Sequence, residues 1–165
     1  MPWALNGTSV TLESGSGTIS VSDITQTKFM QIIWHGLSGG GTALDPFLKF
    51  NTQSSTTNYS SRYSKTGASD TVWTSAYAPG DFGEGGYVYD YLVVVDMCVI
   101  TTEEKLGIAQ SSFDRTAGAG NAPGTVQIVF KYTDTSAITS VFMQDGNDTA
   151  NAQVAGSNIT VFGTD

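Results

Sequence analysis

Hydrophobic and polar residues alternate with a period of two along much of the chain, which is the pattern of strands with one buried face. The clearest case is Thr125–Tyr132, where every second residue from Val126 onward is apolar and Val129 alone interrupts the polar face. The longer segment Tyr87–Ile100 is apolar at most positions. It predicts a central strand. Because it exceeds the usual strand length, we expect a bend or bulge in it, or two consecutive strands.

Turn-forming residues separate several shorter segments that also have strand character. These segments are Gly17–Val21, Phe29–His35, Phe47–Asn51, Asn58–Ser64, Lys105–Ser111, Ile138–Gln144 and Asn158–Phe162. Thr101–Glu104 has the spacing of a helix capping box, but Gly107 follows too closely for a stable helix, so we expect a turn there.

Strands of unequal length, joined by long loops, favour Greek-key crossings. We therefore predict an all-β fold, a two-sheet β-sandwich that is jelly-roll-like. A length of 165 residues suits one domain, and we assign residues 17–165 to it. Residues 1–16 form an N-terminal arm or a first edge strand, in which the large apolar residues Trp3 and Leu5 are candidates for binding a partner.

Charge narrows the range of partners. The formal net charge is -8 and the sequence pI is about 4.3, so the chain would repel a phosphate backbone and nucleic acid is not expected to bind directly. No apolar run approaches the roughly 20 residues that span a bilayer. The start, Met1-Pro2-Trp3, lacks the basic and apolar segments of a signal peptide, so we expect neither membrane insertion nor general secretion.

The chain has few groups suited to nucleophilic or metal-assisted catalysis. His35 is the only histidine and Cys98 the only cysteine, so a zinc centre lacks ligands and a catalytic triad lacks partners. We expect His35 to be a packed or hydrogen-bonded structural residue at a strand end, and Cys98 to be buried. The prediction is a protein that is not an enzyme and needs no metal or cofactor.

Acidic residues offer two weaker alternatives. Asp81, Glu84, Asp90 and Asp96 could supply the paired carboxylates of a glycoside hydrolase, although Asp90 and Asp96 would lie about 20 Å apart along an ideal strand, too far for such a pair. The segment 145–148, Asp-Gly-Asn-Asp, could hold calcium, but these residue types also form ordinary β-turns, which is the interpretation we favour.

Aromatic residues cluster before and within the long apolar segment. We assign Tyr87, Tyr89 and Tyr91 to the core, because aromatic residues on a strand face normally fill it. Tyr77 and Phe82 flank a Pro-Gly-Asp turn, where we expect them to be exposed and to contact a partner.

Three stretches of the sequence resemble a family of tailed-bacteriophage virion proteins that share a jelly-roll domain. The first is Leu48–Asn51 followed by Asn58–Tyr63, with Thr-Gln in place of the family's Gly-Asp turn. The second is Lys105 in the strand after the long apolar segment, followed by Thr135–Ser140. The third is Ala155–Gly163, similar to the family's terminal Ala-Gly-Ser-x-Ile-x-Leu-Tyr-Gly strand, with Val for Leu and Phe for Tyr.

This resemblance implies a structural role in the virion. The expected protein is made in the host cytoplasm and becomes a capsid decoration (cement) protein, a head-fibre base or a tail-associated module. A decoration protein would bind and stabilise the shell of major capsid protein as a homotrimer, with Trp3–Leu5 as a candidate anchor. The alternative is a tail or head-fibre module that binds host glycans through Tyr77 and Phe82. The resemblance implies no catalytic residues.

Overall fold

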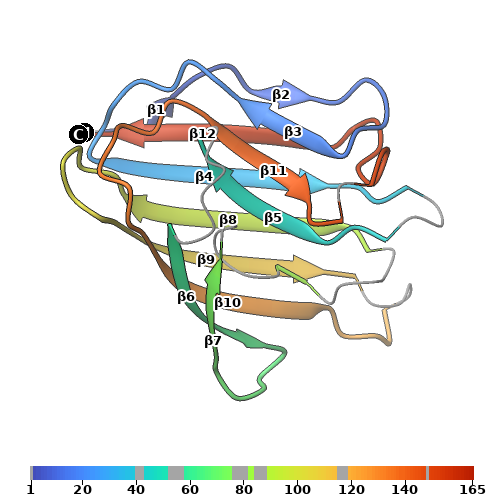
Figure 1. The fold of residues 1–165 in the computed structure, drawn as a ribbon. Coiled ribbons are helices and arrows are strands. Elements are labelled where there is room, and N and C mark those ends of the chain that lie inside the picture. The colour runs from blue at the N-terminus through green and yellow to red at the C-terminus, as the bar shows by residue number, and fades with distance from the viewer. Residues whose placement is uncertain are drawn as a thin grey trace.

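The computed structural model describes residues 2–39, 43–51, 58–75, 82–83, 89–114, 119–147 and 149–165. Within these ranges the protein is all-β and contains no helix (Figure 1). Two antiparallel sheets of very unequal size pack face to face as a sandwich, which confirms the predicted fold class.

The large sheet has nine strands and the small sheet three. In spatial order the large sheet contains β1 (Ala4–Leu5), β12 (Asn158–Thr164), β4 (Phe29–Gly36), β8 (Tyr91–Cys98), β9 (Lys105–Phe113), β10 (Gly124–Tyr132), β6 (Tyr59–Lys65) and β7 (Thr71–Ser75), and β2 (Val10–Thr11) also pairs with β12. The small sheet contains β3 (Thr18–Val21), β11 (Val141–Asp145) and β5 (Pro46–Phe50), in that order.

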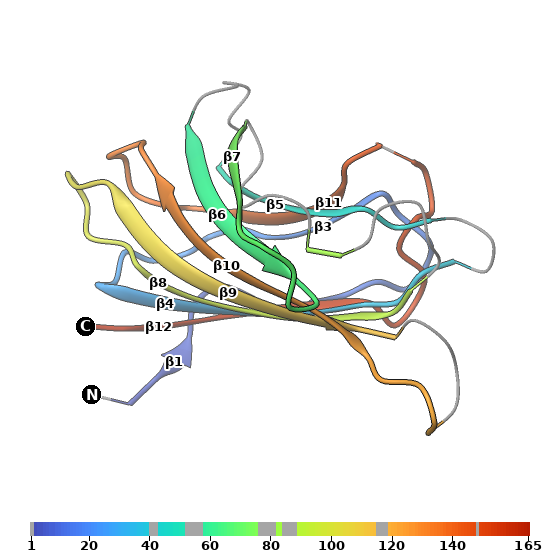
Figure 2. The same cartoon turned by 90° about the horizontal axis from the view of Figure 1, so that it is seen from below.

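The chain crosses repeatedly from one sheet to the other. β3, β5 and β11 lie in the small sheet, whereas β4, β6 and β12, which follow each of them, lie in the large sheet. These three crossings connect the small layer of the sandwich to the large one. By contrast, β8, β9 and β10 are consecutive neighbours that widen the large sheet, and Figure 2 shows its β6 and β10 side curving toward the small sheet.

The N-terminal residues belong to the large sheet of their own chain. Ala4 pairs with Gly163 and Leu5 with Phe162, and the backbone N–H of Asn6 donates to the carbonyl of Val161 at 2.8 Å. β1 and β2 are two residues long and had no recognisable alternation in the sequence. The polar β7, which forms the opposite edge, was likewise not predicted.

The long apolar segment forms a shorter strand than its sequence suggests. β8 begins at Tyr91, because the backbone N–H of Asp90 donates to the carboxylate of Asp114 at 2.6 Å instead of joining the ladder. Tyr91 is buried and Tyr89, half-buried, stacks on Phe113 at 5.4 Å, so both pack in or against the core as predicted. Tyr87 lies outside the described residues.

A buried glutamine links the two sheets. The Trp34 indole Nε1 on β4 donates to Gln153 Oε1 at 3.1 Å, and Gln153 Nε2 donates to the carbonyl of Met143 on β11 at 3.0 Å. Trp34 and Gln153 are completely buried. Because water cannot replace these hydrogen bonds, the glutamine fixes how the large sheet sits on the small one.

Replacing Gln153 tests this link. Gln153→Leu leaves the Trp34 N–H buried without a partner and breaks the link to the Met143 carbonyl, so the free energy of unfolding should fall by about 2–4 kcal/mol. Gln26→Leu is the matched control, since it also removes two amide hydrogen bonds, to the carbonyls of Thr27 and Val99, but from an exposed side chain. Urea titration should show a loss of under about 1 kcal/mol for the control; equal losses would contradict the account.

Candidate binding surface on the large sheet

The large sheet carries apolar side chains on both faces. One face packs against the small sheet; the opposite face, which we call the outward face, is not covered by other strands over β4, β8, β9 and β10 in Figure 2. Among polar residues, this face presents the exposed large hydrophobic residues Phe29, Val72, Leu92, Leu106, Ile108 and Val129, with half-buried Ile33, Val94 and Cys98. Contiguous exposed apolar area of this kind marks interaction sites on folded proteins.

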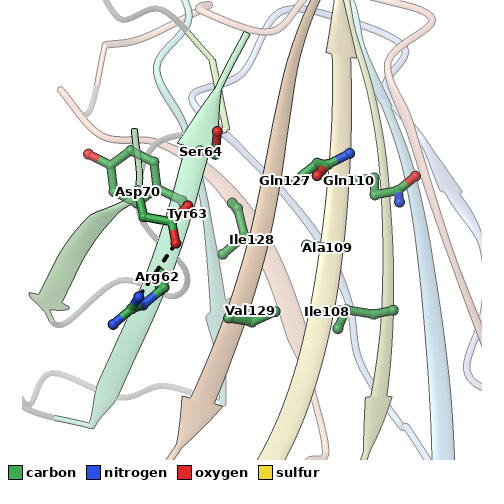
Figure 3. Close-up of a pocket in the computed structure, with 10 residues that line it drawn as sticks. All are labelled: Arg62, Tyr63, Ser64, Asp70, Ile108, Ala109, Gln110, Gln127, Ile128 and Val129. Carbon is green, nitrogen blue, oxygen red and sulfur yellow. Dashed lines mark hydrogen bonds and ion pairs between the residues drawn. The ribbon is translucent and has the colours of Figure 1, made fainter. Parts of the chain in front are cut away.

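Strand register arranges the outward face in rows. Asp96 on β8 lies opposite Ile108 on β9, Ile108 opposite Val129 on β10, and Val129 opposite Arg62 on β6. We call this the central row. Figure 3 shows Ile108 and Val129 side by side, with Gln110 beside Gln127 in the next row. An apolar centre therefore has an acid on one side and a base on the other.

The outward face is hollowed at both sides of this row. A depression of about 280 Å³ runs over β6, β10 and β9 between Arg62, Asp70 and the paired glutamines (Figure 3). A second, of about 320 Å³, is lined by Trp3, Phe29, Asp96, Met97, Cys98, Leu106, Gly107 and Ile108. We call the second depression the apolar corner. Hollows lined by large apolar side chains suit anchoring residues of a protein partner better than a solvated surface does.

Trp3 joins the apolar corner although it is distant in sequence. The pairing of β1 with β12 holds it at the edge of the large sheet, and the side chain of Asn6 strengthens this attachment: it donates to the carbonyl of Thr25 at 2.8 Å and accepts from the Thr25 N–H at 2.7 Å. Trp3 remains 46% exposed and Leu5 61% exposed. Both predicted arm residues are therefore available to a partner.

The prediction for Phe82 is wrong. Its side chain is fully buried and belongs to the hydrophobic core. The adjacent Gly83 fits this position, since a Cβ atom there would lie 2.4 Å from the Tyr91 ring, so residues 82 and 83 lie directly on the core. Burying a phenylalanine stabilises the fold by about 2–3 kcal/mol, which favours the inward orientation. Tyr77, the other predicted loop aromatic, lies outside the described residues.

Two further side chains differ from expectation because they lie on the outward face. Cys98 was expected to be buried but is only half-buried, since its parity on β8 is that of Leu92 and opposite to that of the core residues. His35 was expected to be packed or hydrogen-bonded, and instead is exposed near the end of β4, opposite Leu92. Continuous apolar strand sequences do not reveal which residues face the core.

Three of the aspartates that the structure describes serve as local hydrogen-bond acceptors. Asp90 accepts from the Ser38 N–H at 2.9 Å and Asp96 from the Gln31 amide at 2.8 Å. Asp145 is buried and accepts from the N–H groups of Asp45 and Thr149, which closes the turn that follows β11. No cluster of three or more potential metal-binding side chains occurs among the described residues. Asp81 and Glu84 lie outside them.

A buried lysine lies at one end of β9. Lys105 Nζ donates to the carbonyls of Asp134 at 2.7 Å and Glu103 at 3.0 Å, while burial lowers its pKa. The carboxylate of Asp134 accepts from the Ser136 N–H at 2.8 Å, which is the main reason that its pKa is lowered, and from the Tyr132 hydroxyl at 3.2 Å. This cluster closes the end of the sandwich.

Asp134 should make stability depend on pH. Because its pKa is lower in the folded state, its contribution is present above the ordinary value near 3.8 and disappears as pH falls through the lowered folded value. Asp134→Asn should lose about 1 kcal/mol at pH 7. In denaturant titrations the difference from the wild type should shrink at pH 2–3; a difference that stays constant with pH would contradict this role.

Comparison with known proteins does not identify a ligand or a partner for this surface. No family model matches the chain, and no curated protein has significant sequence similarity to it. The part of the chain that the structure describes contains no apolar helix of bilayer-spanning length. The functional inference therefore rests on the sequence resemblance and on the geometry of the outward face.

Proposed function

We propose that this protein is a non-catalytic structural protein of a bacteriophage virion, a capsid decoration protein that binds and stabilises the shell of major capsid protein as a homotrimer. The observation that carries the proposal is the exposed apolar outward face, which continues to the N-terminal edge through Trp3. Such a face suits a protein that functions by packing against other subunits. The virion location is supported by the sequence resemblance.

The N-terminal edge is the part that we assign to shell binding. Trp3 and Leu5 project from a strand that is held to β12 by only two residue pairs, at the border of the large sheet. A tryptophan at an exposed edge can insert into a pocket of a neighbouring subunit, and tryptophan is among the residues most enriched in binding hot spots. An edge strand can also extend its pairing into a partner.

The charge of the chain agrees with this role. A net charge of -8 keeps the free protein soluble and disfavours contact with packaged DNA. The rival role in glycan binding has lost one of its two expected stacking residues, because Phe82 is buried in the core. We therefore retain the decoration role as the proposal.

The edge can be tested on shells. The double variant Trp3→Ser, Leu5→Ser should weaken binding to assembled capsids of the cognate phage by at least about tenfold, because two exposed anchors are lost. Val72→Ser, which alters a 67% exposed apolar residue at the far edge of the sheet, is the matched control and should bind normally. Co-sedimentation with decoration-free capsids measures both.

The particle itself provides a second readout of this proposal. A decoration protein should be present in hundreds of copies, in keeping with the multiplicity of a shell lattice, and quantitative mass spectrometry of purified virions gives this number. A few copies per virion, or unchanged capsid binding by the double variant, would contradict the decoration role.

A further inference from the structure

We infer that the β9–β10 part of the outward face is the contact between copies of this chain, with the Asp96 side of one copy meeting the Arg62 side of another. The inference rests on the proposed structural role, because it names a partner for the surface on which that role depends. It leaves the N-terminal edge to the shell.

The outward face is far less acidic than the rest of the molecule. The chain as a whole is strongly acidic, so two copies repel each other over most of their surface. On the outward face, however, Arg62 lies near Asp70 and Lys131 is paired with Glu104 at 3.1 Å, which leaves Asp96, among the described residues of this group, as the one acid without a basic neighbour. This nearly neutral area is where another copy can approach with the least repulsion.

A second argument is the order of residues in the central row. Asp96, Ile108, Val129 and Arg62 follow one another across β8, β9, β10 and β6. In a ring of three copies, the Asp96 side of each copy meets the Arg62 side of the next. This arrangement matches opposite charges and brings Ile108 of one copy toward Val129 of the next.

The side chains of the central row are exposed, and its arginine is only weakly paired within one copy. Ile108 and Val129 are each 53% exposed, so each has apolar surface left to bury. Arg62 already reaches Asp70, but at 3.5 Å and with both side chains more than half exposed, a geometry that contributes little stability. A second copy can therefore compete for Arg62 at small cost.

The area of the face is sufficient for a specific contact. The five neighbouring strands β4, β8, β9, β10 and β6 lie about 4.8 Å apart, and each contributes about eight residues. They give a flat footprint of about 600 Å², to which protruding side chains add further accessible surface. A standard interface buries about 800 Å² of accessible surface on each partner. Sheets that pack face to face with twisted strands achieve this kind of contact.

Sedimentation velocity of the purified chain tests the inference. We expect a mass of three copies for the wild type, and the double variant Ile108→Ser, Val129→Ser should raise the dissociation constant at least about 100-fold. Leu5→Ser is the matched control: it removes an equally exposed apolar side chain four strands from β9, and association should be unchanged. A monomeric wild type at high micromolar concentration would overturn the inference.

A charge-reversal cycle tests the pairing itself. Asp96→Arg and Arg62→Glu should each weaken association by about tenfold, and the double variant should recover most of the loss, since the pair is restored with its signs exchanged. Additive losses would overturn the pairing, and melting curves exclude unfolding as the cause. A chain that associates but does not bind capsids would contradict the decoration role alone, whereas a monomer that binds capsids would contradict this inference and the homotrimer but not the binding to the shell.

Discussion

The structure depends on one imbalance: a nine-stranded sheet with apolar side chains on both faces packs against a partner sheet of only three strands. The small sheet covers the inward face, and the large sheet curves around the small one at its β6 and β10 side. On the outward face, Leu106, Ile108 and Val129 remain in contact with water. Monomeric proteins seldom expose apolar area of this continuity, so another subunit is the natural cover.

Polar groups fix the geometry that presents this face. Gln153 links Trp34 on the large sheet to the small sheet through two buried hydrogen bonds, and Lys105 ties the start of β9 to the backbone at Asp134. Buried polar groups that are fully satisfied select one arrangement of a core whose apolar residues could pack in several ways. The strands that carry the outward face are therefore held in one arrangement, with its rows in register.

The fold was largely predictable, whereas the binding surface was predictable only in outline. Alternation identified the long strands, and the fold class followed from their number and spacing. The interruption at Val129, noted as an exception to alternation, belonged to the outward face. Near-continuous apolar strands such as β8 conceal which residues face out, so Cys98 was misplaced, and Phe82 was misplaced because residues of a loop carry no periodic signal. The pairing of the N-terminal arm with β12 could not be predicted, because it joins residues from opposite ends of the sequence.

The central claim is that the outward face is covered when the protein is assembled. Cys98 reports on it directly, because this half-buried thiol lines the apolar corner between Phe29 and Leu106. The second-order rate constant of its alkylation by a maleimide, which is independent of the reagent concentration, should be measured on native protein from nanomolar to high micromolar concentration. We predict that the rate falls as copies associate. A rate that is independent of protein concentration, with association confirmed by sedimentation, would contradict the account.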